Sequence, residues 1–278
     1  MKDLRNANAI VTGASRGLGT HIARALARSG VNVAVAARSA QQLEAVRAEL
    51  VGLGVKAVAI RADVTVAAER QELVDRAVAE LGPIDILVNN AGTELASRYA
   101  DLDPAEIEAM VNLNLTAPLL LIRAVLPRML DRGKGHIVNL SSGAGKVAQP
   151  FDAVYSATKF GLVGATHALR AEHLGSPVGF SVVCPGFVRQ DGMTARYEAQ
   201  GLRIPSLAGT TTPQKVASAV LKAIWEDRAE IIVNSQPIRP MAVLQAAAPQ
   251  VIPRLAKRIG VTSMAARAAE MRRKGAVK

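Results

Sequence analysis

The residues best suited to acid–base chemistry are Tyr155 and Lys159, which open and close the run YSATK. On a helix, four residues correspond to about 40° of rotation and about 6 Å of rise, so both side chains lie on one face. An ammonium near a phenol favours the phenolate and lowers the phenol pKa from about 10. Tyr155 is therefore a candidate proton donor to a carbonyl or acceptor from an alcohol. The pair is weak evidence alone, so its meaning depends on the surrounding elements.

Those elements alternate between short apolar runs and longer amphipathic stretches. The runs predict strands over residues 9–12, 31–36, 56–61, 84–88, 136–140, 179–184 and 231–233. The stretches between them predict helices over 18–29, 41–50, 67–81, 104–130, 152–174 and 213–226, the last with Thr212 as its N-cap. Such alternation predicts right-handed crossovers and a doubly wound parallel sheet in one α/β domain. Ligands of these sheets bind beyond the carboxyl ends of the strands.

Composition agrees with this architecture and narrows the compartment. Half of the 278 residues are apolar and only 3% are aromatic, which suits a core of Ala, Val, Leu and Ile. Cys184 is the only cysteine, which excludes an internal disulfide, and the four histidines are scattered, so we expect no metal site. The polar start, residues 1–8, does not resemble a signal peptide, and we expect a cytoplasmic protein.

A glycine-rich turn joins the first predicted strand to the first predicted helix. Glycines at 13, 17 and 19 allow a tight turn, close approach of a pyrophosphate and close packing of the helix on the sheet. The helix N-terminus offers free N–H groups and a partial positive charge to phosphates. The sequence therefore predicts a dinucleotide site whose turn consists of Gly13, Ser15, Arg16, Gly17, Leu18 and Gly19.

The residues after the second strand indicate which dinucleotide binds. An NAD site usually has an acidic residue there to accept hydrogen bonds from the adenosine ribose. Here residues 36–39 read AARS, without a carboxylate. Arg38 can hold a 2′-phosphate, assisted by Arg16 from the glycine turn. We therefore predict NADP, although a solvated Arg38 remains the alternative.

Further motifs follow the strands at close spacing. Ser141 and Ser142 end the strand before the Tyr155 helix, Asn89-Asn90-Ala91-Gly92 ends the preceding strand, and Asn114 lies within the long helix. Together with the glycine turn and YSATK, these residues resemble the short-chain dehydrogenase/reductase family over about residues 8–187. The resemblance implies a Rossmann-type domain, residues 1–236, that transfers hydride between a nicotinamide and a carbonyl or alcohol.

The resemblance also implies roles for individual residues. Tyr155 would be the acid/base, and Lys159 would lower its pKa and bind the nicotinamide ribose. Ser142 would hold the substrate oxygen, with Ser141 as its competitor. Asn114 would hold a water that links Lys159 to solvent, with Asn112 as the rival.

Other matched positions would contact the cofactor. The run from Asn89 through Asn90 and Ala91 to Gly92 would form the floor under the ribose. Asp63 and Val64 would meet the adenine, although Asp63 also fits an ordinary strand-end carboxylate. Pro185, Gly186 and Val188 would form the turn beside the nicotinamide.

The chain departs from the family pattern after this turn. The family commonly has a threonine that touches the carboxamide, and here Gln190 or Thr194 would have to replace it. Residues 189–211 are expected to form the substrate lid. Its apolar residues either line a pocket or pin the lid to the body: Met193, Tyr197, Leu202, Ile204 and Leu207. Cys184 is expected to be inert core.

A basic extension, residues 237–278, replaces the family's usual Gly-rich ending. It holds nine Lys or Arg and one acidic residue, so it carries most of the net charge of +11. Apolar residues recur among the charges and predict a helical stripe: Met241, Val243, Leu244, Val251, Ile252, Leu255 and Ile259. This extension is expected to dock on its own domain, to lie on an anionic membrane, to cover the active site or to pack on another subunit.

These observations favour an NADP(H)-dependent reductase of a ketone on an apolar substrate, such as a lipid, long-chain keto-acyl or steroid-like ketone. The alternatives are an acyl-carrier-type 3-ketoacyl reductase, and a cofactor sensor without turnover. Nucleic-acid binding is disfavoured because the positive charge lies in a tail without interleaved aromatics. The long helices around 113–125 and 154–169 resemble the family's dimer faces and predict a homodimer or homotetramer.

Overall fold

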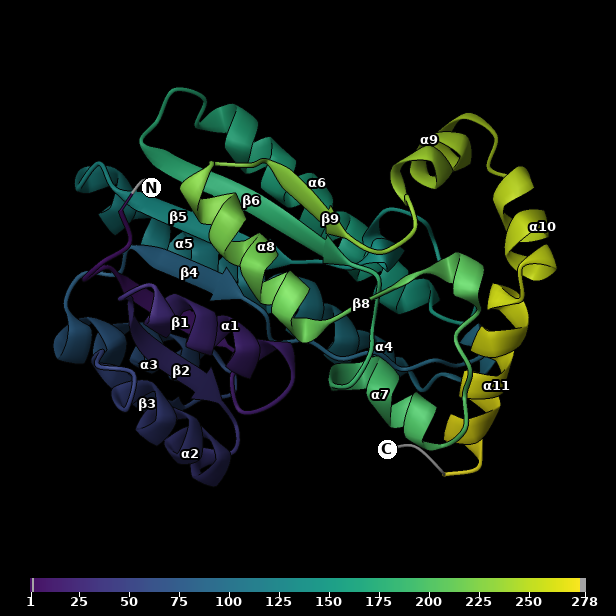
Figure 1. Ribbon diagram of the computed structural model, residues 1–278, viewed down its shortest axis with the longest axis horizontal. Coiled ribbons are helices and arrows are strands. Elements are labelled where there is room, and N and C mark those ends of the chain that lie inside the picture. Colours follow the sequence, from purple (N-terminus) through teal and green to yellow (C-terminus); the bar gives the residue numbers. More distant parts are fainter. Residues whose placement is uncertain (2, 276–278) are drawn as a thin grey trace.

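The computed structural model describes residues 1 and 3–275, with the backbone alone at 193 and 196, and contains a seven-stranded parallel sheet (Figure 1). The strand order is β3-β2-β1-β4-β5-β6-β9. The strands are β1 (Asn8–Thr12), β2 (Asn32–Ala37), β3 (Ala57–Arg61), β4 (Ile86–Asn89), β5 (Gly135–Leu140), β6 (Val178–Pro185) and β9 (Glu230–Val233). The reversal of order between β1 and β4 places the ligand crevice at their carboxyl ends. The predicted α/β fold, with a doubly wound parallel sheet, is confirmed.

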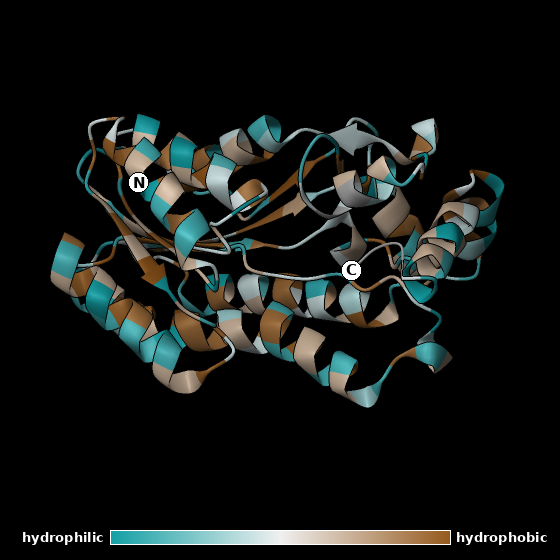
Figure 2. Cartoon of the chain, turned by 90° about the horizontal axis from the view of Figure 1, so that it is seen from below, coloured by the Kyte–Doolittle hydropathy of each residue, from teal (hydrophilic) through white to brown (hydrophobic). Residues whose placement is uncertain are grey.

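Helices cover both faces of this sheet, as the view along its edge shows (Figure 2). Alternate residues of β1 point to opposite faces: Ala9 and Val11 pack with one hydrophobic cluster, and Ile10 packs with the other. The first face carries α1 (Leu18–Arg28), α2 (Ala40–Val51) and α8 (Pro213–Trp225). The second carries α3 (Ala67–Leu81), α5 (Ala117–Asp131) and α6 (Ala153–Glu172). As predicted, the side chain of Thr212 caps α8 by accepting from the Lys215 N–H.

The helix predicted over residues 104–130 is interrupted by one wide turn. It consists of α4 (Pro104–Val111), a π-helical turn η2 (Asn112–Thr116) and α5. Single π turns inside helices are frequent at functional sites because they rotate a side chain out of the α-helical register. This helix is long and apolar enough to cross a membrane by length and composition. In the fold, however, its α5 residues Leu121, Ile122 and Val125 pack under the sheet.

The lid and the basic extension lie at one end of the sheet (Figure 1). The lid begins and ends in a two-stranded sheet, β7 (Phe187–Val188) with β8 (Thr210–Thr211), and contains α7 (Gly192–Ala199) and the short turn η4 (Ser206–Ala208). The basic extension forms α9 (Arg239–Ala247), α10 (Val251–Arg258) and α11 (Val261–Arg273). In Figure 1 these three helices stand beyond the carboxyl ends of the strands. The remaining short turns are η1 (Tyr99–Asp101) and η3 (Gly143–Gly145).

A buried histidine in β5 makes the stability of this fold depend on pH. His136 is 1% exposed, and its Nε2 lies 2.8 Å from the Ser181 hydroxyl. Burial lowers the pKa of His136 to about 4. The unfolded chain binds this proton with a pKa of 6.5, whereas the native state binds it only near pH 4. The free energy of unfolding therefore decreases as the pH falls from about 6.5 to about 4.

We therefore expect the free energy of unfolding to fall by about 2 kcal/mol between pH 7 and pH 5 because of this residue. Urea titrations at both pH values measure the loss. His136→Gln keeps a polar partner for Ser181 and removes the titration, so its loss over the same interval should be smaller by that amount. An equal loss in both proteins would contradict the assignment.

Candidate active site

A cavity of about 1480 Å³ opens at the carboxyl ends of the strands. It runs from the glycine turn after β1, past the ends of β4, β5 and β6, to the lid and the extension. The predicted cofactor positions lie in its wall: Gly13, Ser15, Arg16, Gly17, Leu18, Arg38, Asp63, Val64, Asn90, Ala91, Gly92, Pro185, Gly186 and Val188. Gly19 lies directly beneath this turn. The fold therefore brings together motifs that are far apart in the sequence.

The glycine turn has the geometry of a phosphate cradle. Gly13 and Gly17 have φ values of +65° and +62°, which glycine adopts at low cost. A Cβ at Gly19 would lie 2.3 Å from the Gly13 carbonyl oxygen, so no larger residue fits. Helix α1 begins after Gly17 without a side-chain cap, which leaves its first N–H groups to a ligand. Asn90 supports the turn by donating from Nδ2 to the Thr12 carbonyl oxygen at 2.9 Å.

The adenosine end of the cavity carries the predicted arginines. Arg16 and Arg38 are both exposed and both line the cavity. Asp63 faces the same end, where burial opposes its ionisation. Hydrogen bonds from Thr65 and the nearby charge of Arg38 outweigh burial and lower the pKa of Asp63. An ionised Asp63 held by its own backbone turn suits a contact with a base or a ribose hydroxyl.

Tyr155 and Ser142 meet in the centre of the cavity. Ser142 begins η3, where its hydroxyl accepts from the Ala144 N–H at 3.1 Å, and it lies close enough to the Tyr155 phenol to lower the pKa of that phenol. Tyr155 lies on the first turn of α6 and is 6% exposed. Two hydroxyls from different elements thus converge on one point, as a site that polarises a carbonyl oxygen requires.

Lys159 lies one turn further along α6 and is buried at 5% exposure. Its Nζ donates to the Leu140 carbonyl oxygen at 2.8 Å and lies 5.6 Å from the centre of the Tyr155 ring. Burial lowers the pKa of Lys159 to about 8. The predicted shared face of α6 is therefore present, with the ammonium behind the phenol.

The protonation of Tyr155 differs from the expectation based on the sequence. Burial, followed by the negative charge of Glu94, raises the pKa of the Tyr155 phenol, and the hydrogen bond from Ser142 opposes this rise only in part. Carboxyl groups and low solvation therefore dominate around the phenol in this structure, and the lowering of this pKa by Lys159 stays a prediction. A phenol held neutral is suited to donate its proton.

Asn114 lies inside the π turn and is fully buried. Its amide exchanges two hydrogen bonds with the backbone of Thr93, at 2.9 and 2.8 Å. A Cβ at Gly92 would lie 3.1 Å from the Asn114 Oδ1 and 3.6 Å from the Lys159 Nζ, so both groups approach the same point. The rival Asn112 is exposed on the cavity wall. The structure thus places Asn114 beside Lys159.

Three other residues have structural contacts. The Ser141 hydroxyl donates to the Lys159 carbonyl oxygen at 2.9 Å and stabilises α6. Asn89 donates to the Asn139 side chain at 2.8 Å, inside the core, so it does not line the cavity floor. Cys184 is fully buried, and burial raises the pKa of its thiol to about 12, which suits inert core.

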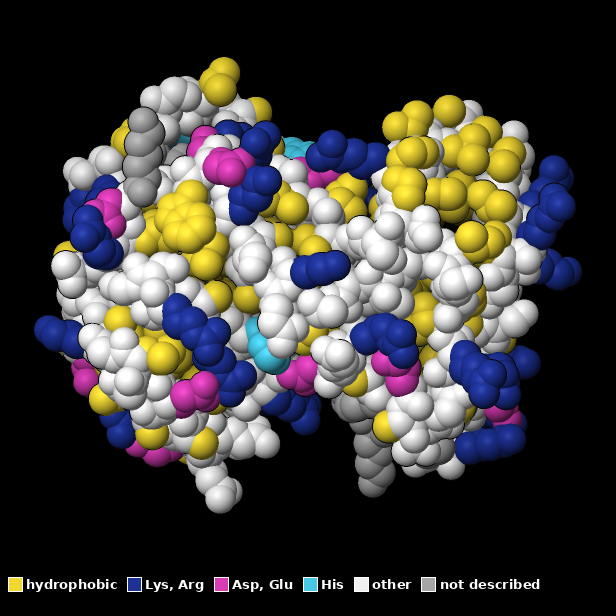
Figure 3. Space-filling model, in the orientation of Figure 1, with side chains coloured by type: hydrophobic (Ala, Val, Ile, Leu, Met, Phe, Trp, Pro, Cys, Tyr) yellow, Lys and Arg dark blue, Asp and Glu magenta, His cyan; other side chains and the backbone are white. Residues whose placement is uncertain are grey.

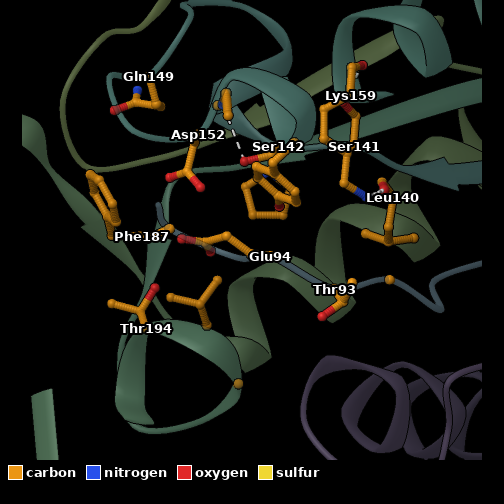
Figure 4. Close-up of a pocket in the computed structure, with 18 of the residues that line it drawn as sticks. Thr93, Glu94, Leu140, Ser141, Ser142, Gln149, Asp152, Lys159, Phe187 and Thr194 are labelled. Carbon is orange, nitrogen blue, oxygen red and sulfur yellow. Dashed lines mark hydrogen bonds between the residues drawn. The ribbon is translucent and has the colours of Figure 1, made fainter. Parts of the chain in front are cut away.

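The lid presents its apolar side chains to the cavity. Tyr197, Leu202, Ile204 and Leu207 line it, while Tyr197 and Leu202 also pack with α11 through Met264 and Ala268. Both predicted functions, lining and pinning, therefore coexist. The side chain of Met193 lies outside the described residues. Of the two candidates to replace the family's threonine, Thr194 lines the cavity and Gln190 does not (Figure 4).

The basic extension closes the far end of the cavity. Its wall includes Ile238, Met241, Ile252, Leu255, Ala256, Ile259, Val261, Met264, Ala265 and Ala268. An ion pair between Arg272 and Glu106 ties α11 to α4, and Gln245 accepts from the Ala148 N–H at 2.9 Å. We call residues 237–275 the cap. Of the apolar stripe predicted for this segment, Met241, Ile252, Leu255 and Ile259 line the cavity. The other residues of the stripe do not line it.

Two residues that line the cavity, Glu94 and Asp152, were not predicted from the sequence. Both point into the centre of the site beside Ser142 (Figure 4). Asp152 lies three residues before Tyr155 in the sequence, and this proximity could have identified it as a candidate site residue. No local pattern identifies Glu94, because only the fold brings the loop after β4 against the start of α6.

Comparisons with known proteins agree with this geometry. The family model described as short chain dehydrogenase matches residues 7–201. A ketoacyl reductase, HetN, of Nostoc sp. is 44% identical over 264 residues, which cover 93% of this chain and 90% of the relative. A 3-oxoacyl-[acyl-carrier-protein] reductase of Synechocystis sp. is 37% identical over 214 residues, covering 76% of this chain and 86% of the relative.

Solved structures give the same result. An actinorhodin polyketide ketoreductase variant, crystallised with NADPH, superposes with a TM-score of 0.76 at 32% identity, covering 83% of this chain and 95% of that chain. A metagenomic short-chain oxidoreductase in complex with NADP has a TM-score of 0.71 at 33% identity, covering 83% and 97%. The chain therefore belongs to the short-chain dehydrogenase/reductase family. The HetN match covers too much of the chain to end before the cap.

The site makes a direct prediction for its central hydroxyl. Tyr155→Phe removes the proton donor and keeps the ring, so we expect carbonyl reduction to slow by about 10²–10⁴-fold. NADPH binding, measured by fluorescence titration, should change little because the phosphate cradle is intact. Ser141→Ala serves as the control, since that hydroxyl donates to the backbone carbonyl oxygen of Lys159 and so stabilises α6. Comparable turnover by Tyr155→Phe and the parent would contradict the assignment.

Proposed function

We propose that this protein is an NADPH-dependent ketone reductase whose substrate carries a long apolar chain. The observation that carries the proposal is the convergence of Ser142 and a neutral Tyr155 on one point of a cavity that also holds the phosphate cradle. The relatives named as ketoacyl reductases support the direction of the reaction. A pure cofactor sensor would not need these two hydroxyls.

NADPH supplies the hydride when it is bound. The α1 N-terminus would hold the pyrophosphate, and the carbonyl oxygen of the substrate would accept hydrogen bonds from Ser142 and Tyr155. As charge develops on this oxygen, Tyr155 gives up its phenolic proton, and the Lys159 ammonium stabilises the phenolate left behind. Asn114 fixes the loop at Thr93 and places a polar amide beside Lys159, where a water would return the proton.

The preference for NADPH over NADH rests on Arg38. Arg38→Asp replaces a cation with an anion where the 2′-phosphate would lie, so we expect NADPH affinity to fall by about 10–100-fold. NADH affinity should stay nearly unchanged. Fluorescence titration of both cofactors measures the change, with Arg47→Asp as a control on the outer face of α2. Equal loss for the two cofactors, or none, would contradict the role of Arg38.

The size and lining of the cavity support an apolar substrate. Apolar side chains of the lid and the cap face the space beyond Tyr155, and they come from α7, α10 and α11. We infer that the cap is part of the catalytic unit, and that it selects substrates with an alkyl chain long enough to reach α10. Long-chain keto-acyl compounds and lipid ketones have this form.

A carrier-linked 3-ketoacyl substrate is the second candidate. Relatives named for acyl-carrier-protein substrates favour it, as does the basic outer face of the cap, which would attract an acidic carrier. Turnover of carrier-linked and free 3-ketoacyl chains of equal length separates the two candidates.

We also propose a homodimer or homotetramer. Leu120 on α5 and Phe160 on α6, the helices that resemble the family's dimer faces, are 43% and 37% exposed. A contact between these helices in two copies would cover both.

The outer face of the cap supports peripheral contact with an anionic membrane. Helix α9 exposes Pro240, Val243, Ala246 and Ala247, and Val243 is 69% exposed. Figure 3 shows this apolar surface with Lys and Arg side chains along the adjoining edge of the molecule, where α10 exposes Arg254, Lys257 and Arg258. An apolar surface with a basic rim is typical of interfacial helices.

Sedimentation with vesicles tests this contact. We expect binding to phosphatidylcholine vesicles that contain phosphatidylglycerol, and little binding to phosphatidylcholine alone. Val243→Asp, or Arg254→Glu with Lys257→Glu, should weaken binding by about tenfold or more. Val51→Asp, at an exposed apolar site on α2, is the matched control. Failure of the parent protein to bind, or equal binding by all variants, would overturn the proposal.

A further inference from the structure

Two carboxyl groups lie beside the reacting hydroxyls and have no part in the proton transfer described above. Glu94 follows β4 and Asp152 precedes α6, and both line the cavity close to Tyr155. In Figure 4 the Asp152 side chain extends from the loop before α6 toward Glu94. Acidic groups close to the buried phenol of Tyr155 are costly, because burial disfavours their charged form, and they are therefore informative.

The backbone fixes the approach of these two groups. The loop that carries Glu94 is held at Thr93 by Asn114 and at Ser97, whose N–H donates to the Phe151 carbonyl oxygen at 2.8 Å. Phe151, directly before Asp152, has a φ of +65°, a conformation that costs free energy for a non-glycine residue. This unfavourable conformation therefore lies at the residue that sets the direction of the chain into Asp152.

Asp152 does not make the capping hydrogen bond that is expected at its position. It is the N-cap of α6, where an aspartate ordinarily accepts a hydrogen bond from an N–H of the first helical turn. Here its side chain makes no such bond and turns into the cavity instead. Its Oδ1 is sealed from solvent and has no hydrogen-bond partner among the described residues. A buried acceptor without a hydrogen-bond partner is costly, so this oxygen is a candidate to accept a hydrogen bond from a ligand.

The two carboxyl groups are close enough to affect each other's ionisation. Burial, and next the charge and hydrogen bond of Glu94, raise the pKa of Asp152 well above its ordinary value. Carboxyl groups in such contact hold one proton between them, because two adjacent negative charges repel each other. The pair then keeps a negative charge and an unoccupied acceptor.

We propose that Asp152 and Glu94 form a substrate subsite that binds a hydrogen-bond donor, ammonium or hydroxyl, on the carbon next to the ketone. The inference rests on the proposed ketone reduction and names the polar end of its substrate. An ammonium gains both the hydrogen bond and the attraction of the pair, a hydroxyl gains the hydrogen bond, and a carboxylate is repelled. The substrate class is thus a long-chain ketone with a neighbouring amine or hydroxyl group.

A matched series of ketones tests the subsite. Four compounds share one long alkyl chain and differ only beside the carbonyl: an aminomethyl ketone, a hydroxymethyl ketone, a methyl ketone and a 2-oxo carboxylate. We expect kcat/KM to fall in that order, with the first two about 10–100-fold above the methyl ketone. NADPH consumption measures each rate.

Variants test whether the preference among the four ketones depends on the two carboxyl groups. Asp152→Asn and Glu94→Gln should each reduce the spread of the series by about tenfold, while NADPH affinity and thermal stability stay near those of the parent. Glu108→Gln is the control, because Glu108 is an exposed carboxylate on the same cavity wall and should leave the spread intact.

Two outcomes would overturn the subsite: equal or better turnover of the methyl ketone by the parent, or an unchanged spread in both variants. They differ from failure of the proposed function, in which the parent binds NADPH and reduces none of the four compounds.

Discussion

The site depends on burying a lysine ammonium at the carboxyl edge of a parallel sheet. Burial of a cation is costly unless hydrogen bonds replace water, and the carbonyl oxygen of Leu140 at the end of β5 provides one at 2.8 Å. The Tyr155 ring lies in front of the ammonium, and a Cβ at Gly92 would lie 3.6 Å from its Nζ, so the loop after β4 packs directly against it. Helix α6, strand β5 and the loop after β4 must therefore keep their relative positions for Lys159 to remain in place.

The same edge explains why distant motifs work together. Parallel strands end at one side of the sheet, so the turn after β1 and the loops after β4, β5 and β6 meet there. The π turn at Asn112–Thr116 then directs Asn114 inward, where it fixes the loop at Thr93. That loop also carries Glu94, so one buried amide supports both the proposed proton path and the proposed subsite.

The sequence predicted what depends on local pattern. Strand and helix periodicity predicted the sheet, and the spacing of Tyr155 and Lys159 placed both on one face of α6. Charge at the site was less predictable, because the pKa of Tyr155 depends on Glu94, which approaches only in the fold. The stripe from Met241 to Ile259 predicted amphipathic helices, whereas its division between the cavity and the outer surface required the tertiary arrangement of the cap.

Transfer of deuterium tests the central claim most directly. Reduced NADP that carries deuterium at both positions of nicotinamide C4 should yield, from a long-chain ketone, an alcohol with one deuterium on the carbinol carbon, detected by mass spectrometry. This result would show hydride transfer from the cofactor to the carbonyl. Oxidation of the cofactor without deuterium in the alcohol, or no alcohol from any apolar ketone while NADPH binds, would contradict the account.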